Sequence, residues 1–156
     1  AIAAAGGKAV AVQGDVSKAE QAKGLIDAAV REYGRLDILV NNAGQGRFKR
    51  VGEMTPEEWH QNIDLNLNGA FYCTHEALAR FGKRGGGFIV NISSLAARNA
   101  FSGGAAYNSP QISSITCAYA MSANNAVPPI MLPIRTGGMN CTIICHHAQS
   151  PARTRR

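Results

Sequence analysis

The sequence predicts an α/β fold in which a parallel sheet lies between two layers of helices. Three short apolar runs, at residues 9–13, 36–41 and 88–92, have the length and composition of buried strands. Two capped segments with helical periodicity, near residues 17–33 and 55–81, separate these runs. Parallel strands need right-handed crossovers of about this length, so the three runs are expected to form adjacent parallel strands.

Capping residues mark the ends of both predicted helices. Ser17 and Glu20 have the spacing of a capping box, and Gly34 follows the last apolar position of the first helix. The segment 55–58 has the same cap pattern, with proline at the first helical position, and the glycines at 85–87 end the second helix. These signals set the boundaries of the predicted elements.

Composition limits the class of protein. The chain has 156 residues, 46% of them hydrophobic, which suits one globular domain. It contains no apolar run long enough to span a membrane, and its four cysteines show no disulfide framework, so we expect a cytoplasmic protein without a membrane partner. The net charge of +6 comes mainly from residues 108–156, which carry four arginines and no acidic residue. This segment lacks interleaved aromatic residues, so no nucleic-acid partner is expected.

The chain divides near Asn108 into two parts of different character. Residues 1–108 contain all the periodic segments, whereas residues 109–156 hold five of the six prolines and three of the four cysteines. We expect the second part to be an irregular C-terminal tail, and the abrupt change suggests a shift of reading frame, which the coding DNA would test. Residues 1–7 resemble a helix end with its glycine stop, so further sequence is expected ahead of them. The cluster of cysteine and histidine at 141–147 lacks a second ligand pair, so no metal is expected.

Five short motifs occur in a fixed order along residues 1–108. They are Gly14-Asp15-Val16, Leu36-Asp37-Ile38-Leu39-Val40-Asn41-Asn42-Ala43-Gly44, Asn66-Leu67-Asn68-Gly69-Ala70-Phe71, Ile89-Val90-Asn91-Ile92-Ser93-Ser94 and Tyr107-Asn108. In order and spacing they resemble the motifs of the short-chain dehydrogenase/reductase family. The resemblance implies a partial Rossmann-like fold without its first βαβ unit, NAD or NADP as cofactor, and hydride transfer between the nicotinamide and a small carbonyl or alcohol substrate.

The resemblance also assigns cofactor contacts. Asp15 is similar to the family aspartate that accepts a hydrogen bond from the adenine amino group, and Val16 to the residue packed against that ring. For Asp15, a purely local role as an acid at a helix N-terminus stays equally open. Ala43 and Gly44 have little or no side chain, so the backbone there can approach the cofactor, while Asn41 is expected to hold the sheet as well as the ligand.

Three residues correspond to the catalytic groups of the family. Ser94 and Tyr107 are 13 residues apart, as are the family's serine and tyrosine. The resemblance implies that Tyr107 exchanges a proton with the substrate oxygen and that Ser94 hydrogen-bonds this oxygen. Asn66 then corresponds to the residue whose helix backbone anchors a proton-relay water.

The chain departs from the family pattern in two places. Four residues after its tyrosine, the family has a lysine that binds the nicotinamide ribose and lowers the tyrosine pKa, whereas this chain has Gln111. The family's glycine-rich T-G-x-x-x-G-x-G loop, which binds the pyrophosphate, does not occur in these residues. Two hypotheses follow: an oxidoreductase with impaired turnover, or an inactive protein that acts by association. The helix at 55–81 carries apolar residues on more than one face and is expected to form a homo-oligomer.

Overall fold

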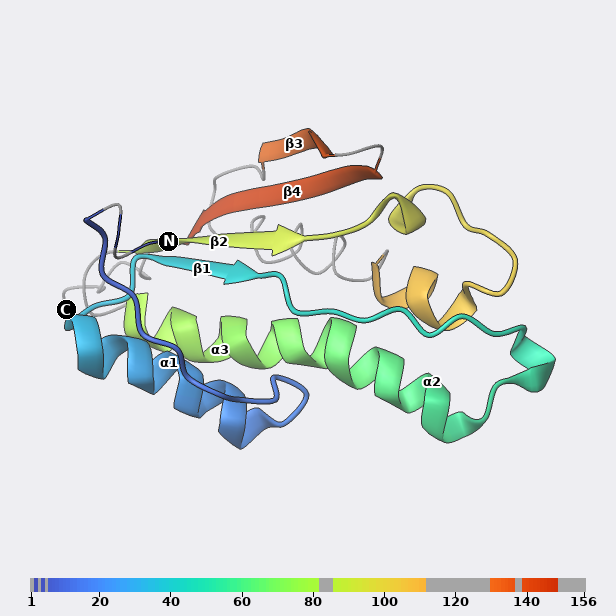
Figure 1. Cartoon of the computed structure of the whole chain (residues 1–156), viewed down its shortest axis with the longest axis horizontal. Coiled ribbons are helices and arrows are strands. Elements are labelled where there is room, and N and C mark those ends of the chain that lie inside the picture. The colour runs from blue at the N-terminus through green and yellow to red at the C-terminus, as the bar shows by residue number, and fades with distance from the viewer. Residues whose placement is uncertain are drawn as a thin grey trace, which may run out of the picture.

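The computed structural model of the chain describes residues 2, 4, 6–81, 86–111, 130–136 and 139–148, and for the last two ranges it describes the backbone alone. The elements in chain order (Figure 1) are α1 (Ala19–Tyr33), β1 (Ile38–Asn41), the 3-10 helix η2 (Val51–Glu53), α2 (Pro56–Ile63), the π-helical turn η3 (Asp64–Asn68), α3 (Gly69–Phe81), β2 (Gly87–Ile92), the 3-10 helix η4 (Leu95–Ala97), β3 (Ile130–Thr136) and β4 (Met139–Ala148). Residues 105–111 are helical as well. In these ranges no helix has both the length and the apolar character needed to cross a membrane.

The strands form one sheet in the order β1-β2-β4-β3. β1 and β2 are parallel, with Leu39 opposite Ile89 and Asn41 opposite Asn91. The helical crossover between them confirms the α/β class and the predicted parallel pairing of these two runs. Figure 1 shows α1 and α3 on the same side of β1 and β2. The second helical layer of the predicted fold is not found within the described ranges.

The hydrophobic core lies between these two helices and the face of the sheet that they cover. Side chains alternate along β1, where Leu39 is buried and its neighbours Ile38 and Val40 are exposed. The same alternation buries Ile89 of β2 completely. The buried cluster consists of Ala22, Ile26, Leu39, Cys73, Ala77, Phe81 and Ile89. It fixes the sheet against α1 and α3 and so fixes the positions of the strand ends.

The predicted strand at residues 9–13 is wrong. The segment is extended but pairs with no strand among the described residues, and Val10 and Val12 remain about half exposed. A β-strand exists only through hydrogen bonds to a neighbour, so an apolar run without a partner is not assigned as one. The segment instead leads into α1, beside which it runs in Figure 1.

The two predicted helix starts have different outcomes. At α2 the capping box is present, because Thr55 Oγ1 accepts from Glu58 N at 3.2 Å and Glu58 Oε2 accepts from Thr55 N at 3.0 Å. At α1 the predicted Ser17–Glu20 box is wrong, because the N-cap is Lys18 and its side chain makes no capping bond. There, Asp15 Oδ1 accepts from Ser17 N at 2.9 Å. An Asx-type turn therefore replaces the capping box.

The predicted helix at 55–81 is confirmed as a continuous helical segment with a defect in its middle. α2 passes into the π-helical turn η3, and α3 continues from Gly69. The backbone N–H of Gly69 bonds to the carbonyl of Asp64, five residues earlier. Such a turn widens the helix by one residue and is frequent at functional sites. It lies at Asn66, one of the predicted catalytic residues.

The C-terminal part is not wholly irregular, contrary to the expectation for residues 109–156. β4 pairs antiparallel with β2, and β3 pairs antiparallel with β4. The apolar and β-branched residues of these runs lack helical periodicity, which is compatible with strands. Pro110 lies within the helical residues 105–111, beyond their first turn. That helix therefore forgoes the backbone hydrogen bond that a residue at 110 would otherwise donate.

An ionic network joins α1 to α3 on the surface. Asp27 forms ion pairs with both Lys23 and Arg80, and Arg80 Nη1 also contacts Glu76 Oε2 at 3.1 Å. Hydrogen bonds from Lys23 and then from Arg80 lower the pKa of the Asp27 carboxyl. Because this pKa is lowered in the folded chain, the network stabilises the fold above a pH of about 4 and is lost as the pH falls below it.

We expect Arg80→Ala to lower the midpoint of thermal unfolding by a few degrees at pH 7, because it removes the one side chain that links Asp27 to Glu76. At about pH 3 the difference between the variant and the parent chain is expected to be smaller than at pH 7, since the stabilisation from a carboxyl with a lowered pKa declines as the pH falls below the pKa of the unfolded chain. Arg31→Ala, an exposed change in the last turn of α1, is the control. Equal differences at both pH values would contradict the assignment.

Candidate active site

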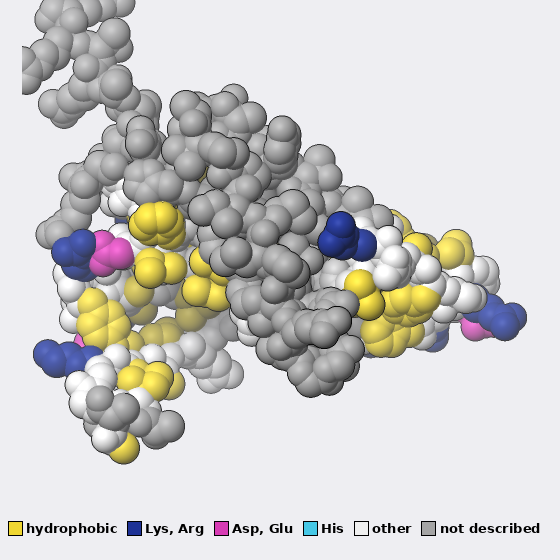
Figure 2. Space-filling view, turned by 90° about the horizontal axis from the view of Figure 1, so that it is seen from above, with side chains coloured by type: hydrophobic (Ala, Val, Ile, Leu, Met, Phe, Trp, Pro, Cys, Tyr) yellow, Lys and Arg dark blue, Asp and Glu magenta, His cyan; other side chains and the backbone are white. Residues whose placement is uncertain are grey.

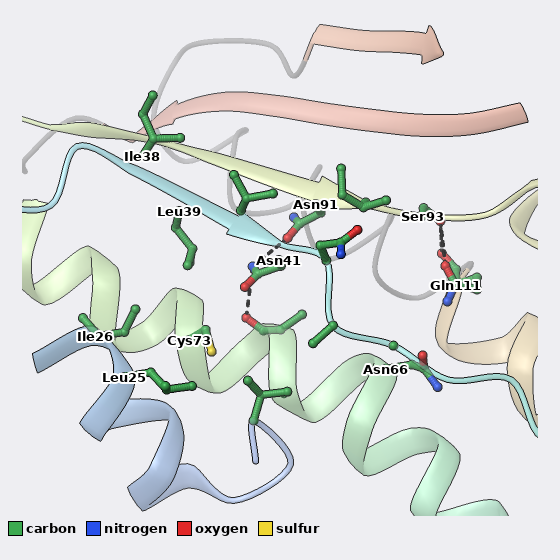
Figure 3. A pocket seen from close by; sticks show the side chains of 18 of the residues that line it. Leu25, Ile26, Ile38, Leu39, Asn41, Asn66, Cys73, Asn91, Ser93 and Gln111 are labelled. Carbon is green, nitrogen blue, oxygen red and sulfur yellow. Dashed lines mark hydrogen bonds between the residues drawn. The ribbon is translucent and has the colours of Figure 1, made fainter. Parts of the chain in front are cut away.

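A cleft of about 370 Å³ runs along β1, between the strand and α1, and reaches the carboxyl ends of β1 and β2. Parallel strands bring their carboxyl ends to one edge, so residues far apart in sequence meet there. Figure 3 shows Asn41, Asn66, Asn91, Ser93 and Gln111 around this cleft. Its lining also includes Val16, Asn42, Ala43, Gly44, Ile92 and Tyr107. Six of the predicted site residues therefore share one cavity: Val16, Asn41, Ala43, Gly44, Asn66 and Tyr107.

Asn66 holds the loop that follows β1. Its Oδ1 accepts from Gln45 N at 3.0 Å, and its Nδ2 donates to Gln45 O at 2.8 Å and to Asn62 O at 2.9 Å. The side chain is only 7% exposed. Asn66 thus ties the π-helical turn to the loop after β1.

Gly44 allows this close approach. A Cβ atom at position 44 would lie 2.8 Å from Asn66 Oδ1, closer than real Cβ contacts. The glycine is therefore required by Asn66 independently of any cofactor.

We expect Gly44→Ala to destabilise the fold by about 1–3 kcal/mol, because either the added methyl group or the Asn66 side chain must move. Gly24→Ala is the matched control, since a Cβ at position 24, inside α1, has no neighbour within 4 Å. It is expected to stabilise the fold by about 0.4–1 kcal/mol. Urea unfolding of both variants measures the change in the free energy of unfolding. A change of the same sign in both variants would contradict the predicted clash at Gly44.

Asn41 holds the sheet to α3. Its Nδ2 lies 2.8 Å from Asn91 Oδ1, 3.0 Å from Thr74 Oγ1 and 3.5 Å from Ala70 O. Asn91 and Thr74 are both buried. These hydrogen bonds agree with the expectation that Asn41 holds the sheet. The contact of Asn41 with a cofactor stays a prediction.

Tyr107 lines the cleft from the helical residues 105–111. Gly104 O accepts hydrogen bonds from Tyr107 N at 2.9 Å and Asn108 N at 2.7 Å, which begins this helix. Ser94 does not line the cleft but lies just after β2, where its Oγ accepts from Ala96 N at 3.2 Å and caps η4. The adjacent Ser93 lines the cleft. The predicted meeting of the Ser94 and Tyr107 hydroxyls in the cleft beside Gly44 stays a prediction.

Gln111 takes the place of the family's lysine inside the cleft. It is 7% exposed and lies one helical turn after Tyr107. Ser93 Oγ donates to Gln111 Oε1 at 3.0 Å. A neutral hydrogen bond therefore joins the tyrosine helix to the end of β2, where the resemblance implied an ammonium group.

Asp15 lies outside the cleft, beside a second, polar cavity of about 310 Å³. Hydrogen bonds from Ser17, the side chain first and then the backbone, lower the pKa of its carboxyl. These contacts support the local role at the start of α1. The adenine contact of Asp15 stays a prediction. The Val16 side chain packs against Gly69 and against the hydrophobic core.

Three contributors to this site escaped the sequence reasoning: Asn91, Ser93 and Phe48. Asn91 and Ser93 belong to a motif in which only Ser94 was assigned, and their alternation along β2 could have indicated that Asn91 faces Asn41. Phe48 contacts the Tyr107 ring from a loop that has no periodic pattern. No local signal in the sequence identifies such a contact.

A protein-family model described as short chain dehydrogenase matches residues 1–126 of the 156. The chain belongs to the short-chain dehydrogenase family. It is 50% identical over 95 residues to an uncharacterised oxidoreductase of Methylorubrum extorquens, covering 61% of this chain and 38% of that protein. It is 36% identical over 142 residues to a 3beta-hydroxysteroid dehydrogenase of Mediterraneibacter gnavus, covering 90% of this chain and 48% of that protein.

A solved structure supports the same fold. The NADPH-dependent 3-quinuclidinone reductase of Rhodotorula rubra superposes with a TM-score of 0.73 at 29% identity, over 76% of this short-chain dehydrogenase and 46% of that protein. The chain therefore spans less than half the length of each of these three proteins. Membership of an oxidoreductase family and a Rossmann-type fold are thereby shown.

Proposed function

We propose that this chain carries the proton-transfer half of an NAD(P)-dependent oxidoreductase site acting on a small carbonyl or alcohol substrate, and that its turnover is impaired. The observation that carries the proposal is the shared cleft of Asn66, Gly44 and Tyr107 at the carboxyl ends of parallel strands. Ligands of open α/β sheets bind at such an edge. Substitution of the lysine by Gln111 is the basis for the impairment.

The chain's own residues have separate tasks in this proposal. Tyr107 exchanges a proton with the substrate oxygen from its place at the cleft. Ser94 accepts from Ala96 N, and a hydroxyl that accepts one bond still donates its hydrogen, here to the substrate oxygen. Asn66 holds the strand-end loop in position through its three bonds.

The lining of the cleft fits a nicotinamide cofactor in part. Val16 and Ile92 offer apolar contacts, and Ala43 and Gly44 bring backbone to the surface of the cavity. These residues would hold a flat heterocycle, and the bound cofactor supplies the hydride. Position 111 fits less well, because its side chain is neutral and already bonded to Ser93. Stabilisation of a tyrosinate by a cation is therefore not available from this position.

A binding experiment tests the proposal without requiring turnover. NADPH fluorescence is titrated with the parent chain, with Ala43→Leu, which fills the cleft, and with Ala79→Leu, the same change at an exposed position of α3. We expect saturable binding by the parent chain and by Ala79→Leu, and binding at least tenfold weaker by Ala43→Leu, about 1.4 kcal/mol. Absence of saturable binding by the parent chain, or equal binding by both variants, would overturn the proposal.

A non-catalytic role by association is the second candidate, and exposed apolar side chains favour it. Trp59 of α2 and both Phe71 and Leu78 of α3 are between 37% and 52% exposed. Exposed apolar side chains that form one contiguous patch commonly mark an interaction surface.

We expect sedimentation at tens of micromolar to show a self-associated chain, and Phe71→Glu to shift it toward monomer, because a carboxylate is costly to bury in an apolar contact. Glu32→Gln, an exposed change on α1, serves as control. A clean monomer for the parent chain would exclude association through this segment.

A further inference from the structure

Two phenylalanine rings form a cluster with Tyr107, the candidate catalytic tyrosine that lines the cleft. The Phe48 ring meets the Tyr107 ring edge-on, with centroids 5.5 Å apart and an interplanar angle of 84°. The Phe101 ring lies 5.5 Å from the Phe48 ring. Phe48 comes from the loop after β1 and Phe101 from the loop after η4, so two separate segments bring their rings to one place.

Both rings are exposed although they are held in position. Phe48 is 58% and Phe101 45% exposed. Each ring folds over a glycine of its own loop: a Cβ at Gly46 would lie 2.4 Å from Phe48 Cζ, and one at Gly104 would lie 2.7 Å from Phe101 Cε2. Figure 2 shows hydrophobic side chains gathered at this end of the molecule, which Figure 1 identifies as the end where the two loops meet.

Rings that are fixed yet uncovered have the properties of a preformed ligand surface. A flat apolar ligand gains contact there and causes little loss of side-chain freedom, because the Phe48 ring already packs against the rings of Tyr107 and Phe101. Ligand sites commonly combine such an apolar wall with a few polar groups. Here the polar residue next to the wall is Tyr107, which lines the cleft.

We propose that Phe48 and Phe101 form the substrate wall of this site and select ketones or alcohols that carry a flat, apolar ring one or two bonds from the reacting carbon. The proposal rests on the proposed function of the cleft. A ring packed on Phe48 places the reacting carbon on the side of Tyr107. Small polar carbonyl compounds gain nothing from this wall.

Nuclear magnetic resonance of the chain with 13C-labelled phenylalanine rings tests the wall. The five phenylalanines are assigned by single substitutions, and the chain is titrated with 2-tetralone and, separately, with hydroxyacetone, which has a carbonyl but no ring. We expect 2-tetralone to shift the Phe48 and Phe101 signals saturably and to leave Phe71 unchanged. Phe71 is the matched control, since it is 52% exposed on α3. Hydroxyacetone is expected to shift neither ring of the wall.

Variants of Phe48 measure how much the wall contributes to the affinity for 2-tetralone. Phe48→Ala is expected to raise the dissociation constant of 2-tetralone about tenfold and Phe48→Leu by a smaller factor, whereas Phe71→Leu leaves it unchanged. The proposal of a substrate wall would be overturned if 2-tetralone shifted the Phe71 and Phe48 signals equally. It would also be overturned if a folded Phe48→Ala chain bound 2-tetralone with unchanged affinity. If Phe48→Ala does not fold, the titration of the parent chain and of Phe48→Leu decides.

The outcomes separate this inference from the proposed function. Binding of 2-tetralone at the wall together with no NADPH binding at the cleft keeps the wall and overturns the oxidoreductase proposal. Saturable NADPH binding sensitive to Ala43→Leu, with no 2-tetralone shift at Phe48, keeps the oxidoreductase proposal and overturns the wall.

Discussion

The 156-residue polypeptide is expected to show little or no dehydrogenase turnover with NAD or NADP, and Gln111→Lys alone is not expected to restore it. These residues contain no glycine-rich loop to donate backbone hydrogen bonds to the pyrophosphate, and each such bond to a charged group contributes about 1.5–3 kcal/mol. A lysine at position 111 would also replace the amide oxygen that accepts from Ser93. The new ammonium would enter a site where the present side chain is 7% exposed, which opposes its charged form.

The measurement is the rate of NADPH oxidation with common ketones. It is made for the parent chain and for Gln111→Lys, and again for each of these two chains with a strand and glycine-rich loop from a relative fused to its N-terminus. We expect the fusion that carries lysine to gain far more than either change alone. Tyr107→Phe in that fusion is the control that assigns the proton to this side chain. Turnover by the unmodified polypeptide that Tyr107→Phe abolishes would show that Gln111 substitutes for the lysine.

Asn41→Leu is expected to lower the free energy of unfolding by about 2–4 kcal/mol, the largest effect on stability that we predict. The change keeps most of the side-chain volume and removes the donor that Asn91 Oδ1 and Thr74 Oγ1 share. Both of these acceptors belong to buried residues, so neither regains a hydrogen bond from solvent. Since a domain is stable by only about 5–15 kcal/mol, a loss of this size is readily measured.

Urea unfolding compares Asn41→Leu with Asn42→Leu, the same change at the next residue, which is exposed. Asn42→Leu is expected to have little effect on stability. Asn41→Leu combined with Asn91→Leu is expected to recover part of the loss, because it removes the orphaned acceptor together with its donor. Equal midpoints for the two single variants would show that Asn41 contributes nothing through these bonds.

Local patterns in the sequence determined most of the elements. Apolar runs predicted β1 and β2, and helical periodicity predicted α1 and the segment from α2 to α3. Thr55 and Glu58 predicted a helix start correctly because a capping box is completed within four residues. The family motifs likewise identified Asn66, Gly44 and Tyr107, which the fold brings to one cleft.

The tertiary structure alone decided which contacts these residues make. Residues 9–13 resemble a strand locally, but a strand requires a partner, which a local pattern does not supply. The bonds from Asn66 to Gln45 and from Ser93 to Gln111 join residues 21 and 18 positions apart, and that between Asn41 and Asn91 spans 50. The contact of Phe48 with Tyr107 is of the same kind. Periodicity and capping report interactions within a few residues, whereas these contacts arise only when packing around a common core brings distant segments together.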